Sequence, residues 1–329
     1  RPDGPLPLSL SQQRLWFLET LTPGRSLFNT PLALKLTGQL NEAALGQACQ
    51  ALVQRHESLR TTFTAVSGVP QQIIHQTWPV SLEKLNVTTD DLNRQLQTAV
   101  QRPFNLENGP LLRFHLVRCS RQEHILLLAF HHLIFDDWLA SIVVDELVTL
   151  YRAFAQTGQP ELSQFPLQYA DYALSQRQHL TDELLQTQLT YWQNQLAGDL
   201  PLLQLPTDKP RPEVKTHQGA VESITLSAQL SGQVSSLCQQ TGSTPFMLLL
   251  AAFQAWLHRY TGQDDMLVGT PVANRQQPEL AGLIGFFVNT VVLRSQVDGW
   301  QTFRQLLAQV RQTAASAYLS PDLPFPKMT

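Results

Sequence analysis

Two histidines and two aspartates stand close together, immediately after a strand-like apolar run. Residues 131–138 read HHLIFDDW, and residues 125–130 before them are all apolar. A neutral imidazole, with a pKa near about 6.5, can accept a proton or a hydrogen bond from an attacking nucleophile at pH 7. Polar side chains at the end of a buried strand cost free energy unless they are paired. The segment therefore predicts a site for acid–base chemistry or nucleophile positioning, with His132 as its central residue.

Asp136 follows His132 by four residues. A carboxylate is too acidic to be a good base unless its pKa is raised, so we expect Asp136 to fix the local geometry by pairing with a cation. Arg275, which ends the segment GTPVANR at residues 269–275, is the candidate cation from the second half of the chain. His132 and Asp136 also have a spacing that metal ligands use, but the sequence offers no third or fourth ligand, so we expect no metal site.

Strand and helix patterns surround this segment and must position it. Residues 111–117 and 124–130 are short apolar runs separated by a polar turn, which predicts two neighbouring strands. An amphipathic helix follows from about Trp138, and Asp136 or Asp137 can serve as its N-cap. The site is therefore expected where a buried strand gives way to a helix.

The remaining patterns also alternate between helices and strands. The sequence SLSQ at residues 9–12 is a capping box that opens a helix, and Asn41 is the N-cap expected for a second one. Residues 199–218 are rich in proline and lack periodicity, which predicts a connector. Further helices are expected from about Ser231 and over residues 245–260, with strands near residues 61–63, 221–226, 266–272 and 284–293. This alternation predicts an α/β or mixed α+β architecture in two lobes.

Length and composition limit the classes of protein that the chain can represent. The 329 residues, 43% of them hydrophobic, are enough for a large core and about two domains. The net charge of −3 and the absence of a Lys/Arg-rich run disfavour nucleic acid and anionic membranes as partners. Three distant cysteines argue against a disulfide framework, and no apolar run approaches the roughly 18–20 residues that span a bilayer. We therefore expect a cytoplasmic protein, and the start without methionine reads as a piece of a longer polypeptide.

Five motifs of the chain resemble, in the same order, those of one enzyme family. Residues 131–137 (HHLIFDD) are similar to the HHxxxDG signature of the condensation domains of nonribosomal peptide synthetases, which belong to the chloramphenicol-acetyltransferase-like acyltransferases. The other four similar motifs are residues 9–18 (SLSQQRLWFL), 55–63 (RHESLRTTF), 169–173 (YADYA) and 284–290 (IGFFVNT). Because the five motifs span most of the chain, the resemblance is specific.

The resemblance implies a mixed α/β fold of two chloramphenicol-acetyltransferase-like lobes in a V with a central tunnel. The N-terminal lobe would comprise residues 1–175 and the C-terminal lobe residues 176–329. Two peptidyl carrier domains would dock at opposite mouths, each with a substrate as a thioester on its own phosphopantetheine arm, so the domain itself would bind no cofactor. The amine of the acceptor would attack the donor thioester and form an amide bond, with an adenylation domain as a neighbour in the same polypeptide.

The resemblance also implies roles for individual residues. His132 corresponds to the catalytic residue of the family, in one motif with His131 and Asp136, and Asp136 is read as structural, paired with Arg275. His132 can act as a general base or only orient the amine, and both roles stay open. The residues expected to support the site structurally are Arg55, Arg60, Asp137, Trp138, Arg275 and Asn289.

Two departures from the family pattern bear on these expectations. Asp137 stands where the signature has glycine, which tolerates unusual dihedrals, although aspartate also tolerates the left-handed region. The seventh motif of the family is missing, so the second lobe is expected to be incomplete and to expose a strand edge or an apolar patch. Two rival functions stay open: a catalytically inactive docking platform for carrier domains, and an acyltransferase of the same superfamily that uses coenzyme A.

Overall fold

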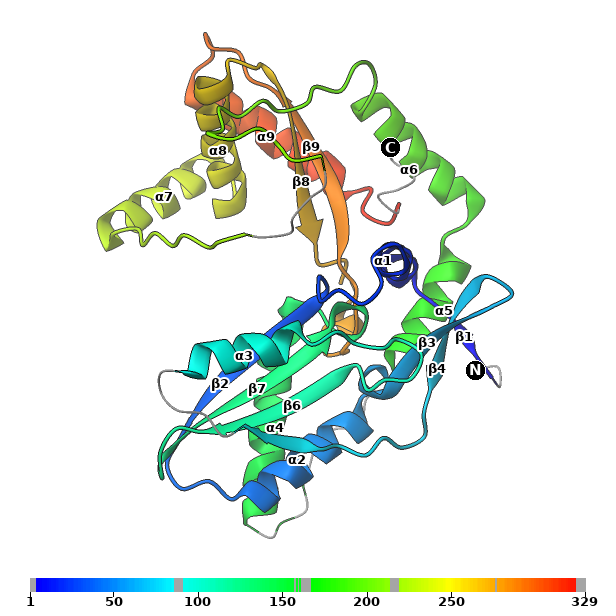
Figure 1. Ribbon diagram of the computed structural model, residues 1–329. Helices are drawn as coiled ribbons and strands as arrows, with labels where there is room; N and C mark the ends of the chain where they lie inside the picture. The colour runs from blue at the N-terminus through cyan, green and yellow to red at the C-terminus, as the bar shows by residue number, and fades with distance from the viewer. Residues whose placement is uncertain are drawn as a thin grey trace. The chain divides into compact units, whose positions relative to one another are not determined.

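The computed structural model describes residues 4–85, 91–156, 158, 160, 167–213, 219–275 and 277–323. The chain forms two compact units, of which the first consists of Arg1–Thr181 with Ala273–Val288 and the second of Asp182–Val272 with Asn289–Thr329. Both units contain helices and strands, which confirms the predicted mixed α/β architecture (Figure 1). The lobe boundary after residue 175, the V shape and the central tunnel stay predictions.

The main sheet of the first unit has four strands in the order β2-β7-β6-β5. β7 pairs antiparallel with both β2 and β6, and β5 is a parallel edge strand beside β6. The strands are β2 (Asn29–Thr37), β5 (Leu82–Leu85), β6 (Leu112–Arg118) and β7 (Glu123–His131). The two neighbouring strands predicted from the apolar runs are therefore confirmed as β6 and β7, and β7 ends at the first histidine of the pair.

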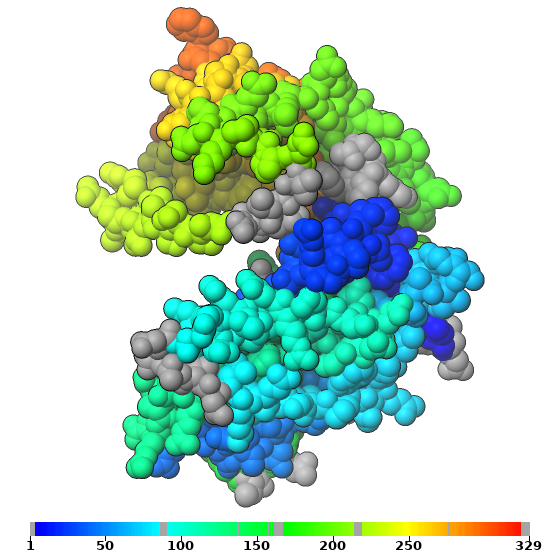
Figure 2. Space-filling model, in the orientation of Figure 1, coloured from blue at the N-terminus to red at the C-terminus, as the bar shows by residue number. Residues whose placement is uncertain are grey.

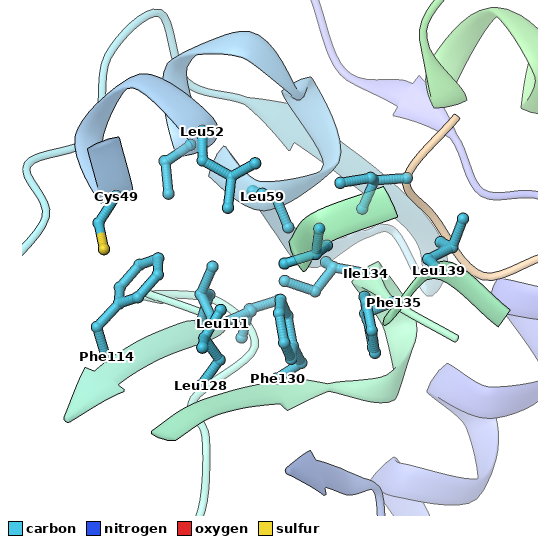
Figure 3. Close-up of a cluster of buried hydrophobic side chains, with 14 of the residues drawn as sticks. Cys49, Leu52, Leu59, Leu111, Phe114, Leu128, Phe130, Ile134, Phe135 and Leu139 are labelled. Atoms are coloured by element: carbon cyan, nitrogen blue, oxygen red, sulfur yellow. The ribbon is translucent and has the colours of Figure 1, made fainter. Parts of the chain in front are cut away.

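Alternate side chains of β7 pack against two helices, α2 (Glu42–Arg55) and α4 (Ala140–Ala155). Leu126, Leu128 and Phe130 point to the same face of the sheet because side chains alternate along a strand. The buried residues of α2 and α4 that share their cluster include Leu45, Cys49, Leu52, Val143 and Leu147. Figure 3 shows Leu52 of α2 opposite Leu128 and Phe130 of β7. Full burial of a leucine or phenylalanine side chain stabilises the fold by about 1.5–3 kcal/mol, so this cluster fixes the strand that ends at His131.

The first two helices start where the sequence predicted them. α1 (Leu10–Leu21) has Ser9 as its N-cap, and the capping box with Gln12 is complete in both directions. α2 has Asn41 as its N-cap, with the Asn41 side chain accepting a hydrogen bond from the backbone of Ala44. Figure 2 shows α1, in blue, at the surface of the molecule. One side of α1 is nevertheless buried, and this side faces the turn that follows β7.

Smaller elements complete the described part of the first unit. A second antiparallel sheet has the order β1-β4-β3, and β3 begins at Thr61, where a strand was expected. Its strands are β1 (Leu6–Pro7), β3 (Thr61–Val66) and β4 (Val69–Ile74), and the helices are α3 (Leu92–Gln101) and α5 (Tyr169–His179). The 3-10 helices are η1 (Glu57–Arg60), η3 (His132–Ile134), η4 (Asp137–Leu139) and η5 (Pro278–Leu280).

The second unit contains an antiparallel pair of strands and four helices in its described part. The strands are β8 (Asp265–Val272) and β9 (Asn289–Gln296), and the helices are α6 (Asp182–Gln195), α7 (Ala228–Thr241), α8 (Pro245–Thr261) and α9 (Phe303–Tyr318). The predicted apolar helix is confirmed as α8, with Thr244 as N-cap and Pro245 at the first helical position. None of the helices in the described ranges is both long and apolar enough to cross a bilayer.

α8 carries a row of large apolar side chains that are only partly covered. These are Phe246, Leu249, Phe253, Trp256 and Tyr260, with exposed fractions between 40% and 58%. Their spacing of three and four residues places them on one face of the helix. An exposed apolar patch was expected in this half of the chain, and α8 carries one.

Two of the predicted strands differ from the structure. Residues 221–226 form no strand, and Val221 and Ile224 are 90% and 89% exposed. A strand needs a partner for its backbone groups, and the described part of the chain provides none beside this segment. The strand predicted over residues 284–293 begins only at Asn289, because the backbone before it makes hydrogen bonds to side chains of the first unit.

The expected N-cap of α4 was also wrong in part. Asp136 does not cap the helix, because its carboxylate accepts hydrogen bonds from elsewhere in the first unit. η4 precedes α4, whose N-cap position is occupied by Leu139 without a side-chain hydrogen bond. The backbone of Asp137 belongs to η4, while its side chain lies outside the described residues.

Candidate active site

β7 stops at the histidine pair because the backbone changes partners there. The backbone N–H of His131 donates to Leu111 O at 2.9 Å, and the N–H of His132 donates to Phe28 O at 2.8 Å. The chain then turns into η3, whose apolar residues Leu133 and Ile134 join the buried cluster of the first unit. The histidines are therefore held at the end of a rigid strand.

The ring of His131 is almost fully buried and makes a local hydrogen bond. Its Nδ1 accepts from the backbone N–H of Leu133 at 3.1 Å, so the proton of the neutral ring must be on Nε2. Burial lowers the pKa of His131, although the nearby Glu19 carboxylate opposes this shift. His131 is therefore a neutral imidazole at pH 7 that supports the turn from below the reacting residue.

The ring of His132 has the opposite arrangement of protons. Its Nδ1 lies 2.6 Å from the carbonyl oxygen of Phe135, and a carbonyl can only accept, so Nδ1 is the protonated nitrogen. Nε2 of the neutral ring then has an unprotonated lone pair. The ring is half-buried and lies 4.8 Å from the ring of Phe286, measured between centroids. This arrangement presents Nε2 as the atom that can accept a proton or a hydrogen bond.

Asp136 is buried and lies beside Arg275, as the sequence predicted. Its Oδ2 accepts from Arg275 Nη2 at 3.4 Å and from the backbone N–H of Phe287 at 3.2 Å. Burial raises the pKa of Asp136, while Arg275 and the N–H of Phe287 oppose that shift. The long distance to Arg275 and the hydrogen bond from the backbone indicate that Asp136 joins two segments of the first unit and does not transfer protons.

Arg275 is held by more than its pairing with Asp136. Its Nη1 donates to the carbonyl oxygens of Leu280 at 2.6 Å and Leu283 at 2.9 Å, and its guanidinium lies 3.8 Å above the Phe287 ring. Burial lowers the pKa of Arg275 from its ordinary value. These contacts fold residues 273–288 into a compact loop in the first unit, which places Phe286 beside His132.

A chain of hydroxyl groups links this loop to the start of α1. Burial raises the pKa of Tyr169 well above its ordinary value, so it stays a phenol and donates to the carbonyl oxygen of Phe286. The Ser9 hydroxyl lies 2.8 Å from the Tyr169 oxygen and must donate to it, because the single phenol proton is already used. Ser9 in turn accepts from the backbone N–H of Gln12, so the cap of α1 helps to fix the neighbour of His132.

Gly285 makes the packing of this loop sensitive to substitution. A Cβ at this position would overlap the ring of Tyr169. We expect Gly285→Ala to lower the free energy of unfolding by about 1–3 kcal/mol, because neither backbone nor ring can move without breaking other contacts. Gly46, inside α2, has no atom within 4 Å of an added Cβ. Gly46→Ala is therefore a control that should be neutral or stabilising in the same urea denaturation experiment, and equal losses in both variants would contradict the packing argument.

Arg55 and Arg60 lie at structural ion pairs away from His132. Arg55 Nε lies 3.1 Å from Glu146 Oε1 and so links α2 to α4. Arg60 donates to the carbonyl oxygen of His75 and lies 3.9 Å from Glu57. These residues stabilise the elements behind the site.

The remaining predicted residues are more distant from the chemistry or partly described. Trp138 lies in η4 and is 65% exposed. Asn289 is in the second unit, where its amide donates to Pro321 O and Leu323 O at 2.7 and 2.9 Å. Among the described residues, no group of three or more His, Cys, Asp or Glu gathers as a metal site. The sequence reasoning missed Glu19 and Phe286, although both lie inside or beside segments that it had singled out.

Comparison with known proteins agrees with this arrangement. The family described as "Condensation domain" matches residues 3–329. The chain belongs to the condensation domain family. Among curated relatives, this condensation domain is 48% identical over 330 residues to a linear gramicidin synthase of Brevibacillus parabrevis, covering 98% of this chain and 6% of that protein. It is 42% identical to the phosphinothricin tripeptide synthetase PhsC of Streptomyces viridochromogenes, covering 99% of this chain and 31% of that protein.

Solved structures share the fold of this condensation domain. The X-domain in its complex with OxyB from teicoplanin biosynthesis superposes with a TM-score of 0.89 at 29% identity, over 100% of this chain and 73% of that chain. The first condensation domain of the CDA synthetase superposes with a TM-score of 0.81 at 20% identity, over 98% of this chain and 78% of that chain. The chain therefore spans about three quarters of these structures and about a third or less of the synthetases it matches.

Proposed function

We propose that this condensation domain forms a peptide bond between two carrier-bound substrates. The donor is an acyl or peptidyl thioester, and the acceptor is the amine of an aminoacyl thioester, each on the phosphopantetheine arm of a peptidyl carrier domain. The proposal is supported by the membership in the condensation domain family and by the relatives among peptide synthetases. The single observation that carries it in the structure is the half-buried His132, whose Nδ1 is tied to Phe135 O and whose Nε2 is unprotonated in the neutral ring.

The reaction needs one proton to leave the amine. An α-amine has a pKa of about 7.7–8.0, so roughly a tenth or more is neutral and nucleophilic at pH 7. Its nitrogen attacks the thioester carbonyl carbon, the C–N bond forms, and the C–S bond breaks. The proton lost by the amine is balanced by protonation of the released thiol of the donor arm. His132 Nε2 either accepts that proton on the way or accepts a hydrogen bond that orients the amine.

The test uses purified donor and acceptor carrier domains loaded with a panel of aminoacyl groups. We expect the donor acyl mass to move to the acceptor arm, as followed by intact-protein mass spectrometry, and only when both carriers are loaded. Binding of each carrier is measured in parallel with the same loaded domains. Carriers that bind without any transfer across the panel would overturn the proposal.

A second candidate function is a docking platform without peptide-bond chemistry. It is favoured by the likeness to the X-domain, which has been solved in a complex with OxyB. In that case a partner protein would bind with unchanged affinity when His132 is replaced, and no dipeptide would form with the original chain. The carrier assay above separates the two candidates, because peptide formation that depends on His132 excludes a purely docking role.

A further inference from the structure

One side of α1 grips the turn that carries His132. Gln12, Leu15 and Glu19 are buried and follow one another at intervals of three and four residues, so they share a helix face. The Gln12 amide donates to the carbonyl oxygen of Leu133 at 3.0 Å. The backbone N–H of the same Leu133 donates to His131 Nδ1. Both polar backbone groups of the residue after His132 are therefore fixed by side chains.

The Glu19 carboxylate faces the other nitrogen of His131. Glu19 Oε2 lies 3.8 Å from His131 Nε2, and both side chains are nine-tenths or more buried. Within the described part of the chain, neither atom has a hydrogen-bond partner. The distance is too long for a hydrogen bond, so the interaction between them is electrostatic. A buried carboxylate in this position requires an explanation, because burying a charged group costs free energy.

The tautomer of His131 gives that explanation. If the proton were on Nδ1, that N–H would point at the backbone N–H of Leu133, and the hydrogen bond that shapes the turn would be lost. A negative carboxylate beside Nε2 stabilises the tautomer that carries its proton there. The rings of Phe104 and Phe28, at centroid distances of 6.0 and 6.4 Å, are the aromatic neighbours of this imidazole and offer no competing acceptor.

We propose that Glu19 is a positioning residue that acts through His131 on His132. The carboxylate keeps the proton of His131 on Nε2, His131 Nδ1 then holds Leu133, and Leu133 fixes the turn that presents the His132 ring. Gln12 holds the same turn from the same helix face. The inference rests on the proposed function, because His132 is the residue whose position it explains.

The experiment replaces Glu19 in the full chain and measures both peptide formation and the His131 tautomer. Glu19→Met removes charge and acceptor at similar length, and Glu19→Gln keeps an acceptor oxygen but removes the charge. We expect kcat to fall about 10–100-fold in Glu19→Met and less in Glu19→Gln, with KM for the loaded carriers little changed. The matched control is Glu107→Gln, the same chemical change at an exposed glutamate, which should leave kcat unchanged.

A double-mutant cycle tests whether the effect passes through His131. The Oδ1 atom of asparagine can accept from Leu133 N–H in place of Nδ1, so His131→Asn keeps the turn but removes the ring that Glu19 faces. If the inference is right, Glu19→Met lowers kcat in the wild-type background and has little further effect beside His131→Asn. Additive losses in kcat would overturn it.

The tautomer itself is read by ¹⁵N NMR of histidine-labelled protein. We expect the wild-type chain to show His131 protonated at Nε2 and the Glu19→Met variant to show a mixture of the two tautomers. An unchanged His131 spectrum in Glu19→Met would also overturn the inference. This readout needs neither carriers nor product, so an inactive wild-type chain would count against the proposed function alone.

Discussion

Replacement of His132 by alanine is expected to lower kcat for peptide formation by about 10²–10⁴-fold, with little change in thermal unfolding. The large effect follows because Nε2 is the unprotonated nitrogen of a ring that is fixed by Phe135 and by the neighbouring Phe286. The small effect on stability follows because the ring is half-buried and makes one side-chain hydrogen bond. The measurement is single-turnover transfer between two loaded carriers, with a melting curve for each variant.

The size of the loss in a second variant separates the two open roles of His132. Glutamine can place a polar atom near the position of Nε2 but cannot accept a proton at neutral pH. If His132 mainly orients the amine, His132→Gln should keep much more activity than His132→Ala. If it is the base, both variants should be equally slow. Unchanged turnover in a folded His132→Ala protein would exclude either role.

The part of the site that lies on one continuous segment could be predicted from the sequence. The apolar run before His131 and the spacing to Asp136 identified the strand end and the turn, since both depend on local patterns. The capping box of α1 and the proline at the start of α8 were predicted for the same reason. Motif order also pointed to Arg275, although 139 residues separate it from Asp136.

The parts that were missed depend on contacts between distant segments. Residues 284–288 have a strand-like composition, but Tyr169 and Asp136 bind their backbone and hold them as a loop. Glu19 looks like a surface residue in a helix of mixed polarity, and only the fold shows that it faces His131. Local propensity loses to tertiary contacts in both cases, because the buried backbone and charge must find partners.

The stability of the site and its chemistry depend on different residues of one motif. His132 carries the atom that can react, whereas His131, Asp136 and Arg275 hold the segments around it. A substitution in the second group should therefore act first on folding and only then on turnover. Asp136 is the strongest case, because it is completely buried beside a charged partner.

Replacement of Asp136 by alanine is expected to lower the free energy of unfolding by about 3–5 kcal/mol, because it leaves Arg275 as a buried cation without its counter-charge and the N–H of Phe287 without its acceptor. Asp136→Asn keeps an acceptor for Phe287, so its loss should be smaller. Urea denaturation of the three proteins measures both effects. A normally stable Asp136→Ala protein without activity would contradict the structural role and place Asp136 in the chemistry.

The pH dependence of the Asp136→Asn comparison tests the same carboxylate. Burial raises the pKa of Asp136 in the folded state above its ordinary value of 3.8, so the folded state holds this proton more tightly than the unfolded chain does. Stability from this group is therefore present at low pH and is lost as the pH rises from about 4 through the raised pKa. The asparagine variant does not titrate, so the stability of the wild type relative to Asp136→Asn should fall over this window. A difference that stays constant from about pH 4 to about pH 7, or that grows, would show that Arg275 and the N–H of Phe287 outweigh the cost of burial.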